Sequence, residues 1–184
     1  MKVIGVSGMP GSGKSVVSRI AAKMGYKIIR MGDVIRDEAQ RRGEDVGEVA
    51  VNLRTEFGNN IVAERCVDKI KQINRQDFPE SSNVADKFII EGIRSPFEVD
   101  FFKNKFENFR VIAVHSTPKT RFKRLRRRKR SDDSIDYDEF IKRDKRELGF
   151  GIGDVIATSD YMIINEGPLW RYKKALTNLF KRFS

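Results

Sequence analysis

The sequence predicts an α/β fold in which a parallel sheet of about five strands carries helices on both faces. Two observations lead to this prediction. Short runs rich in β-branched residues alternate along the chain with longer segments whose apolar residues recur at helical spacing. That order is typical of repeated strand-helix-strand units, which build parallel sheets. The expected strands are residues 3–7, 27–31, 88–91, 110–115 and 161–165.

Length and composition limit the class of protein. A chain of 184 residues is typical of one domain, and folding then buries about two-thirds of the surface exposed by the unfolded chain. We therefore expect residues 1–184 to form a single domain. No run of roughly 18 apolar residues occurs, and the single cysteine, Cys66, excludes an intrachain disulfide. These features lead us to expect a cytoplasmic protein without a membrane segment.

The charge of the chain indicates its ligands. The 37 Lys and Arg residues against 26 Asp and Glu residues give a formal net charge of +11. Such an excess favours polyanionic partners, which are either phosphate groups gathered in one cleft or the backbone of a nucleic acid. Composition does not separate these two classes, so the motifs have to decide between them.

The first expected strand is followed by the glycine-rich stretch GMPGSGKS and then by a helical pattern. The stretch matches G-x-x-x-x-G-K-[ST], whose backbone N–H groups converge on phosphate oxygens at the positive end of a helix. We expect Lys14 to reach the β- and γ-phosphates and the Ser15 hydroxyl to bind Mg²⁺. The stretch therefore predicts a P-loop that binds ATP with Mg²⁺, formed by Gly8, Met9, Pro10, Gly11, Ser12, Gly13, Lys14, Ser15 and Val16.

The carboxyl ends of the next two strands supply candidate residues for a second substrate, because ligands of open parallel sheets bind beyond the strand ends. Asp33 falls near the start of a helix and Arg36 follows one turn later. A carboxylate there commonly caps the helix; the alternative is that Asp33 faces the transferred phosphate while Arg36 binds the acceptor. Glu91 ends the third strand, where it can hold Mg²⁺ through water, and Arg94 can pair with an anionic acceptor.

The fourth expected strand leads into KTRFKRLRRRKR, a strongly basic run at residues 119–130. Such a run is commonly a solvated face or a nucleic-acid patch. Here RSDD and KRDKRE follow, and acidic residues beside arginines indicate that the arginines are held in place. We therefore expect residues 119–145 to form a short lid whose arginines stabilise charge on a transferred phosphoryl group. The candidates are Arg124, Arg128, Arg130 and Arg143.

Taken in order, GMPGSGKS, MGDVIR, EGIR, RLRRR with RSDD and a late arginine resemble the parts of adenylate kinase and related nucleoside monophosphate kinases. The resemblance implies that Lys14 and Ser15 serve ATP and Mg²⁺, and that Arg36 and Arg94 bind an acceptor monophosphate such as AMP. Acceptor-binding helices would then span about residues 32–75, and Arg54 within them is a further candidate for substrate binding.

The same resemblance assigns roles to the basic segment. It implies that Arg124 and Arg128 contact the adenine and phosphates of the donor, and that Arg130 and Arg143 close over the reacting phosphoryl group. The sequence departs from the family at Met31, where Ser or Thr is usual. The later segment RDKRELGFGIGDVIATSDYMIINEGPL is instead similar to dephospho-coenzyme A kinase, and SDD with RDxRELxFGIG is similar to a group of archaeal adenylate-kinase-related proteins.

Three functions remain open at this point, and in the first two the protein is an ATP-dependent phosphotransferase. A nucleotide kinase would phosphorylate an AMP-like phosphate, which needs no base. A hydroxyl kinase of the dephospho-coenzyme A kinase type would use a carboxylate such as Asp33 as the base. An ATP-dependent switch protein bound to RNA or ribosomes would explain the charge, but Phe122 is the only aromatic residue in the basic run, and stacking on single strands normally needs more.

Overall fold

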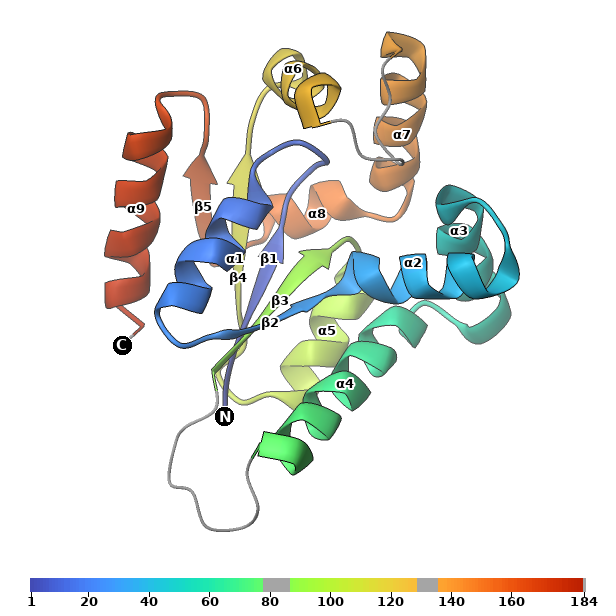
Figure 1. Cartoon of the computed structure of the whole chain (residues 1–184), viewed down its shortest axis with the longest axis horizontal. Coiled ribbons are helices and arrows are strands. Elements are labelled where there is room, and N and C mark those ends of the chain that lie inside the picture. Colours follow the sequence, from blue (N-terminus) through green and yellow to red (C-terminus); the bar gives the residue numbers. More distant parts are fainter. Residues whose placement is uncertain (78–86, 129–135, 184) are drawn as a thin grey trace.

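The computed structural model describes residues 1–77, 87–128 and 136–183 of the chain (Figure 1). Five parallel strands form a sheet with the order β2-β3-β1-β4-β5. This confirms the predicted fold class, and the strand bounds lie within a few residues of those expected. The strands are β1 (Lys2–Ser7), β2 (Lys27–Arg30), β3 (Lys87–Ile93), β4 (Arg110–His115) and β5 (Tyr161–Ile164).

Helices follow the strands and cover both faces of the sheet (Figure 1). Helices α1 and α9 lie against one face, and α4, α5 and α8 against the other. Helices α6 and α7 lie beyond the carboxyl ends of the strands. The bounds are α1 (Lys14–Lys23), α2 (Met31–Arg42), α3 (Val46–Phe57), α4 (Ile61–Asp77), α5 (Pro96–Lys105), α6 (Pro118–Arg128), α7 (Tyr137–Gly149), α8 (Ile152–Ala157) and α9 (Leu169–Lys181).

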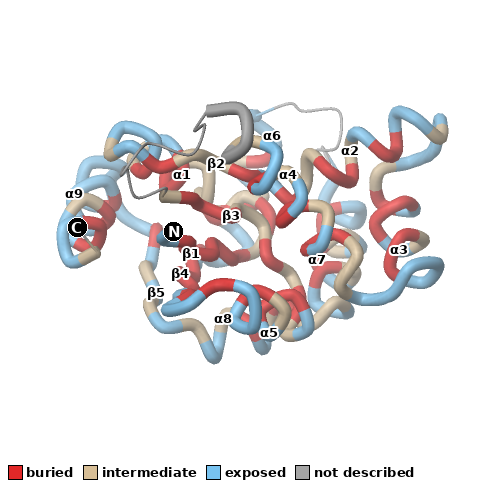
Figure 2. The backbone as a smooth tube through the Cα atoms, turned by 90° about the horizontal axis from the view of Figure 1, so that it is seen from below, coloured by how far each residue is buried: buried red, intermediate tan, exposed pale blue. Residues whose placement is uncertain are grey.

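The core has two parts because neighbouring side chains of a strand point to opposite faces of the sheet. Val3 pairs with Phe88 in the sheet register and packs with the α2–α5 side, whereas Ile4 pairs with Ile89 and packs with α1 and α9. Figure 2 shows buried residues running through the central strands. Cys66 lies in the first part, fully buried on α4, and burial raises the pKa of its thiol to about 12.

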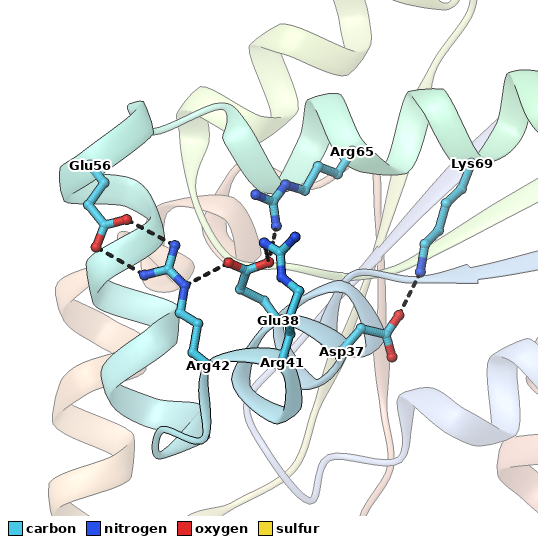
Figure 3. Close-up of polar contacts among 7 residues, drawn as sticks. All are labelled: Asp37, Glu38, Arg41, Arg42, Glu56, Arg65 and Lys69. Atoms are coloured by element: carbon cyan, nitrogen blue, oxygen red, sulfur yellow. Dashed lines mark hydrogen bonds and ion pairs between the residues drawn. The ribbon is translucent and has the colours of Figure 1, made fainter.

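Helices α2, α3 and α4 are joined by ion pairs around one buried carboxylate (Figure 3). Glu38 of α2 is 4% exposed and accepts hydrogen bonds from Arg41, Arg42 and Arg65, the last of which belongs to α4. Arg42 also donates two hydrogen bonds to Glu56 of α3, at 3.0 and 2.9 Å. These arginines lower the pKa of Glu38 to about 2. These ion pairs therefore connect α2, α3 and α4 to one another without involving the sheet.

In the described residues, no helix is both long and apolar enough to span a membrane.

Candidate active site

The loop between β1 and α1 takes a shape that requires glycine. Gly8, Gly11 and Gly13 have φ angles of 145°, 80° and 107°, which side chains disfavour. A Cβ on Gly13 would lie 2.3 Å from Nδ2 of Asn165, and a Cβ on Gly8 would lie 2.4 Å from the carbonyl oxygen of Val114. The loop is thus pressed against the ends of β4 and β5, and a larger residue would displace it.

The carbonyl group of Ser12, in the loop, forms hydrogen bonds with side chains that lie outside the following helix. The carbonyl of Ser12 accepts hydrogen bonds from Asn165 Nδ2 at 2.8 Å, Ser116 Oγ at 3.2 Å and Arg124 Nη1 at 3.3 Å. Helix α1 then begins at Lys14, and among the described residues no side chain caps it. The N–H groups of Lys14 and Ser15 are therefore available to anionic oxygens, whereas that of Val16 already donates to the carbonyl of Gly13 at 3.0 Å. The helix dipole also favours negative charge at this end.

Lys14 lies over this loop as a half-buried cation. Its ammonium donates to the carbonyl oxygens of Gly8 and of Met9, the latter at 3.1 Å. Burial lowers the pKa of Lys14 to about 8, although the nearby carboxylates of Glu91 and Glu147 raise it. A phosphate chain placed on the loop would compensate the buried charge and replace the carbonyl oxygens as acceptor of these hydrogen bonds.

A cavity of about 730 Å³ opens over the loop. Residues from the loop, α2, β3, α6 and α7 line it, and most sequence-predicted residues are among them. Met9 and Ser12 belong to the loop without lining this cavity, and Arg130 lies outside the described residues. The predicted residues that do line it are Gly8, Pro10, Gly11, Gly13, Lys14, Ser15, Val16, Arg36, Glu91, Arg94, Arg124, Arg128 and Arg143.

A second cavity of about 480 Å³ adjoins the first between α2, α3 and α7. Arg36, Arg94, Arg143 and Glu147 line both cavities, so the two cavities are neighbours that share these side chains. The first contains the P-loop, and the second lies beside the helices that the resemblance assigns to acceptor binding. The structure thus brings together two cavities lined by several cations, at the carboxyl ends of the strands.

Oxygen ligands suited to Mg²⁺ line the first cavity. The hydroxyl of Ser15 and the carboxylate of Glu91 both belong to its wall. Glu91 accepts a hydrogen bond from Ser18 Oγ and lies 3.6 Å from Nε of Arg30, so its carboxylate is held in place. Hydroxyl and carboxylate oxygens are the donors that Mg²⁺ prefers, together with phosphate oxygens and water. These residues therefore fit a Mg²⁺ ion that arrives with a triphosphate.

Two predicted substrate residues lie outside both cavities. Asp33 is partly exposed and forms an ion pair with Arg36, so its carboxylate positions that arginine. Arg54 is buried and donates to Glu98 at 2.7 Å, while the other oxygen of Glu98 accepts the backbone N–H of Arg94 at 2.8 Å. Arg54 therefore holds Glu98, which in turn binds the backbone of Arg94. The side chain of Arg54 lines neither cavity.

Glu147 is a site residue that sequence reasoning missed. It is 2% exposed, and its Oε2 lies 3.0 Å from Nε of Arg94. In the sequence it belongs to RDKRELG, which has the amphipathic pattern of a surface helix. The available signal was the motif RDxRELxFGIG, which includes this glutamate.

Arg121 and Asp144 form a second buried pair that sequence reasoning missed. Arg121 donates to both carboxylate oxygens of Asp144, at 2.8 and 2.5 Å, and to the carbonyl of Pro10 at 3.2 Å. Its guanidinium also lies 5.0 Å from the ring centroid of Phe140. One arginine of the basic run therefore joins α6, α7 and the P-loop.

Comparisons with known proteins agree with this geometry. A family model described as an AAA domain matches residues 7–142. A UPF0200 protein of Methanothermobacter thermautotrophicus is 59% identical over 184 residues, which cover 100% of this chain and 92% of that protein. A UPF0200 protein of Methanococcus maripaludis strain S2 is 44% identical over 187 residues, covering 99% and 97%.

Solved structures share the fold at low identity. A shikimate kinase from Bacteroides thetaiotaomicron has a TM-score of 0.58 and 18% identity, with 99% of this chain and 98% of that chain covered. A gluconokinase from Sinorhizobium meliloti 1021 has a TM-score of 0.57 and 16% identity, with 99% and 95% covered. At such identities the likeness concerns the fold alone. The chain belongs to the UPF0200 family and carries an AAA domain with the fold of P-loop small-molecule kinases.

Proposed function

We propose that this protein is an ATP-dependent phosphotransferase that moves the γ-phosphoryl group of Mg-ATP to a nucleotide-type acceptor such as AMP. The observation that carries this proposal is that the two cavities are neighbours and share several charged side chains. The first holds the P-loop with Lys14, the second is lined by cations, and both share Arg36 and Arg94. A protein that only bound or hydrolysed ATP would need the first cavity alone.

In the proposed reaction, the side chains position two anions and spread the charge that develops between them. Lys14, Arg128 and Arg143 would face the transferred group, because all three line the first cavity. Arg36 and Arg94 would hold the acceptor in line with it. Ser15 and Glu91 would hold Mg²⁺, which when bound neutralises charge on the β- and γ-phosphates.

The inner face of α6 supports a kinase over an RNA-bound switch. Arg121 is 3% exposed, and Arg124 donates to the carbonyl oxygens of Ser12 and Asn165 at 3.3 and 2.8 Å. These two arginines of the basic run are therefore directed to the P-loop rather than to solvent. The remaining cations of this helix are exposed, and one of them, Arg128, lines the first cavity; the others are Lys119, Lys123, Arg126 and Arg127.

A second candidate is a hydroxyl kinase of the dephospho-coenzyme A kinase type, and Glu147 is the observation that favours it. A hydroxyl acceptor benefits from a carboxylate within hydrogen-bond reach. Asp33, the sequence-predicted base, lies outside both cavities, whereas Glu147 lines both.

The two candidate functions are distinguished by the variant Glu147→Gln, with Asp33→Asn for comparison. A hydroxyl kinase should lose about 10²–10⁴-fold in kcat with Glu147→Gln, whereas a monophosphate kinase should change mainly in acceptor KM.

The experiment for the proposed function is an acceptor panel. The protein is incubated with Mg-ATP and AMP, CMP, UMP, dephospho-coenzyme A or RNA, and both ADP and the phosphorylated product are quantified. We expect one small acceptor to raise ADP formation and to appear phosphorylated. ADP formation that stays at the basal rate with every small acceptor would contradict the proposal, and RNA-stimulated hydrolysis without phosphorylated product would favour the switch.

A further inference from the structure

The second cavity has more positive charge than its own carboxylates balance. Five cationic side chains and three carboxylates line it. Arg36 and Arg94 are paired with Asp33 and Glu147, and these two arginines also reach the first cavity. The charged residues that line the second cavity only are Lys142, Arg146, Asp45 and Glu139, so what matters is whether these cations and carboxylates pair with one another.

Two cations of α7 lack partners in this cavity. Within the described part of the chain, neither Lys142 nor Arg146 forms an ion pair or a side-chain hydrogen bond, and Nε of Arg146 is buried without an acceptor. The carboxylate of Asp45 lies near Arg146 but accepts the N–H groups of Gly47 and Glu48, at 2.7 and 3.2 Å. Among the described residues, neither Asp45 nor Glu139, the other carboxylate that lines only this cavity, forms an ion pair with Lys142 or Arg146. A buried donor left without an acceptor is unfavourable, and an anionic ligand would supply one.

The backbone of α3 makes room for one of these cations. A Cβ added to Gly47 would lie 2.2 Å from Nη1 of Arg146 and 2.8 Å from its Cζ. The absence of a side chain at Gly47 therefore lets the guanidinium of Arg146 lie close to the start of α3. Any larger residue at position 47 would push Arg146 out of this place.

We propose that Lys142 and Arg146, beside Gly47, form a subsite for a second anionic group of the acceptor. This inference rests on the proposed function and narrows its substrate class. The acceptor would carry one anionic group at Arg36 and Arg94, next to the P-loop, and another at its far end, toward α3. The chemical class is a small molecule with separated anionic groups, such as a nucleoside bisphosphate, in preference to a simple monophosphate.

The subsite is tested by binding, without ATP, so that no turnover is needed. AMP, adenosine 2′,5′-bisphosphate and adenosine 3′,5′-bisphosphate are titrated calorimetrically into the wild type, Arg146→Met, Gly47→Ala and the control Lys145→Met. Lys145 is exposed on the same helix and lines neither cavity. We expect at least one bisphosphate to bind the wild type about tenfold more tightly than AMP. Arg146→Met and Gly47→Ala should remove that preference, and Lys145→Met should keep it.

The outcomes distinguish this inference from the proposed function. Equal affinity of the wild type for AMP and both bisphosphates, or the same loss in Arg146→Met and Lys145→Met, would overturn the subsite whatever the acceptor panel gives. If the Arg146-dependent preference is found but no acceptor is phosphorylated, the subsite stands and the kinase proposal fails. Circular dichroism of each variant shows whether a loss of binding reflects loss of folding.

Discussion

The proposed donor half of the site, which is the P-loop with α1, α6 and the end of β5, differs from the proposed acceptor half in how its charges are satisfied. The acceptor half consists of α2–α4 and the residues of α7 that line the second cavity. In the donor half, buried hydrogen bonds fix the loop before any ligand binds, as those to the carbonyl of Ser12 illustrate. In the acceptor half, ion pairs around Glu38 hold the helices from outside, while Lys142 and Arg146 face the cavity without partners among the described residues. The donor half is thus ordered by hydrogen bonds within the chain, whereas the acceptor half contains two cations to which an anionic ligand would supply a partner.

The largest effect is expected from the centre of the donor half. Lys14→Met removes the cation that faces the transferred group, so we expect kcat/KM to fall by about 10³-fold or more. Steady-state kinetics with the best acceptor of the panel measures this change. Lys23→Met, an exposed lysine at the other end of α1, is the matched control. An equal loss in both variants would show that Lys14 has no special role.

Breaking the ion pair between Arg121 and Asp144, which joins α6 and α7 to the P-loop, should lower the free energy of unfolding. Arg121→Met leaves Asp144 as a carboxylate without its partner in a buried place, and we expect the free energy of unfolding to fall by about 3–5 kcal/mol. Urea denaturation followed by circular dichroism measures it. Arg126→Met on the exposed face of α6 should change the free energy by less than about 0.5 kcal/mol. If Arg121→Met lowered the free energy of unfolding as little as Arg126→Met does, the pair would not order the donor half as described.

The acceptor half should be destabilised less by loss of its buried carboxylate. Glu38→Gln keeps the shape but weakens three charge-assisted hydrogen bonds, for an expected loss of about 1–3 kcal/mol. Because the pKa of Glu38 is lowered to about 2, the contribution of Glu38 to the free energy of unfolding depends on pH. The contribution is complete above the unfolded pKa of about 4.3 and is lost as pH falls toward 2. Urea titrations at pH 7 and pH 3 measure the free energy of unfolding of the wild type, of Glu38→Gln and of the exposed control Glu44→Gln. If the difference between the wild type and Glu38→Gln were as large at pH 3 as at pH 7, this prediction would be wrong.

The smallest effect is expected from the proton on Lys14. Because burial lowers its pKa to about 8, the free protein loses the charge above that pH, while a bound triphosphate favours the charged form. The Kd of a non-hydrolysable ATP analogue should therefore be flat below pH 8 and rise by up to about tenfold per pH unit above it. Calorimetric titration between pH 6.5 and 9.5 tests this, with Lys14→Met as control. A wild-type profile without that rise would argue against a lowered pKa.

The same contrast explains what could be predicted from the sequence. The donor loop is a continuous motif between a strand and a helix, so its residues and their fold context could be read locally. The acceptor half depends on contacts between distant segments. Arg54 pairs with Glu98, 44 positions along the chain, and Glu147 reaches Arg94 from α7. Spacing along one helix gives no information about such pairs, so Arg54 was expected to face a ligand and Glu147 was not expected at all.

The proposal that neighbouring donor and acceptor regions share one reaction is tested most directly by measuring the Michaelis constants for ATP and for the acceptor separately. Single-turnover and steady-state transfer from Mg-ATP is measured for the wild type, Lys14→Met and Arg94→Met with the acceptor found in the panel. The account predicts that Arg94→Met raises the acceptor KM by about tenfold or more with little change in the ATP KM, while Lys14→Met impairs transfer at saturating acceptor. If Arg94→Met altered the ATP KM and left the acceptor KM unchanged, the second cavity would not be an acceptor site.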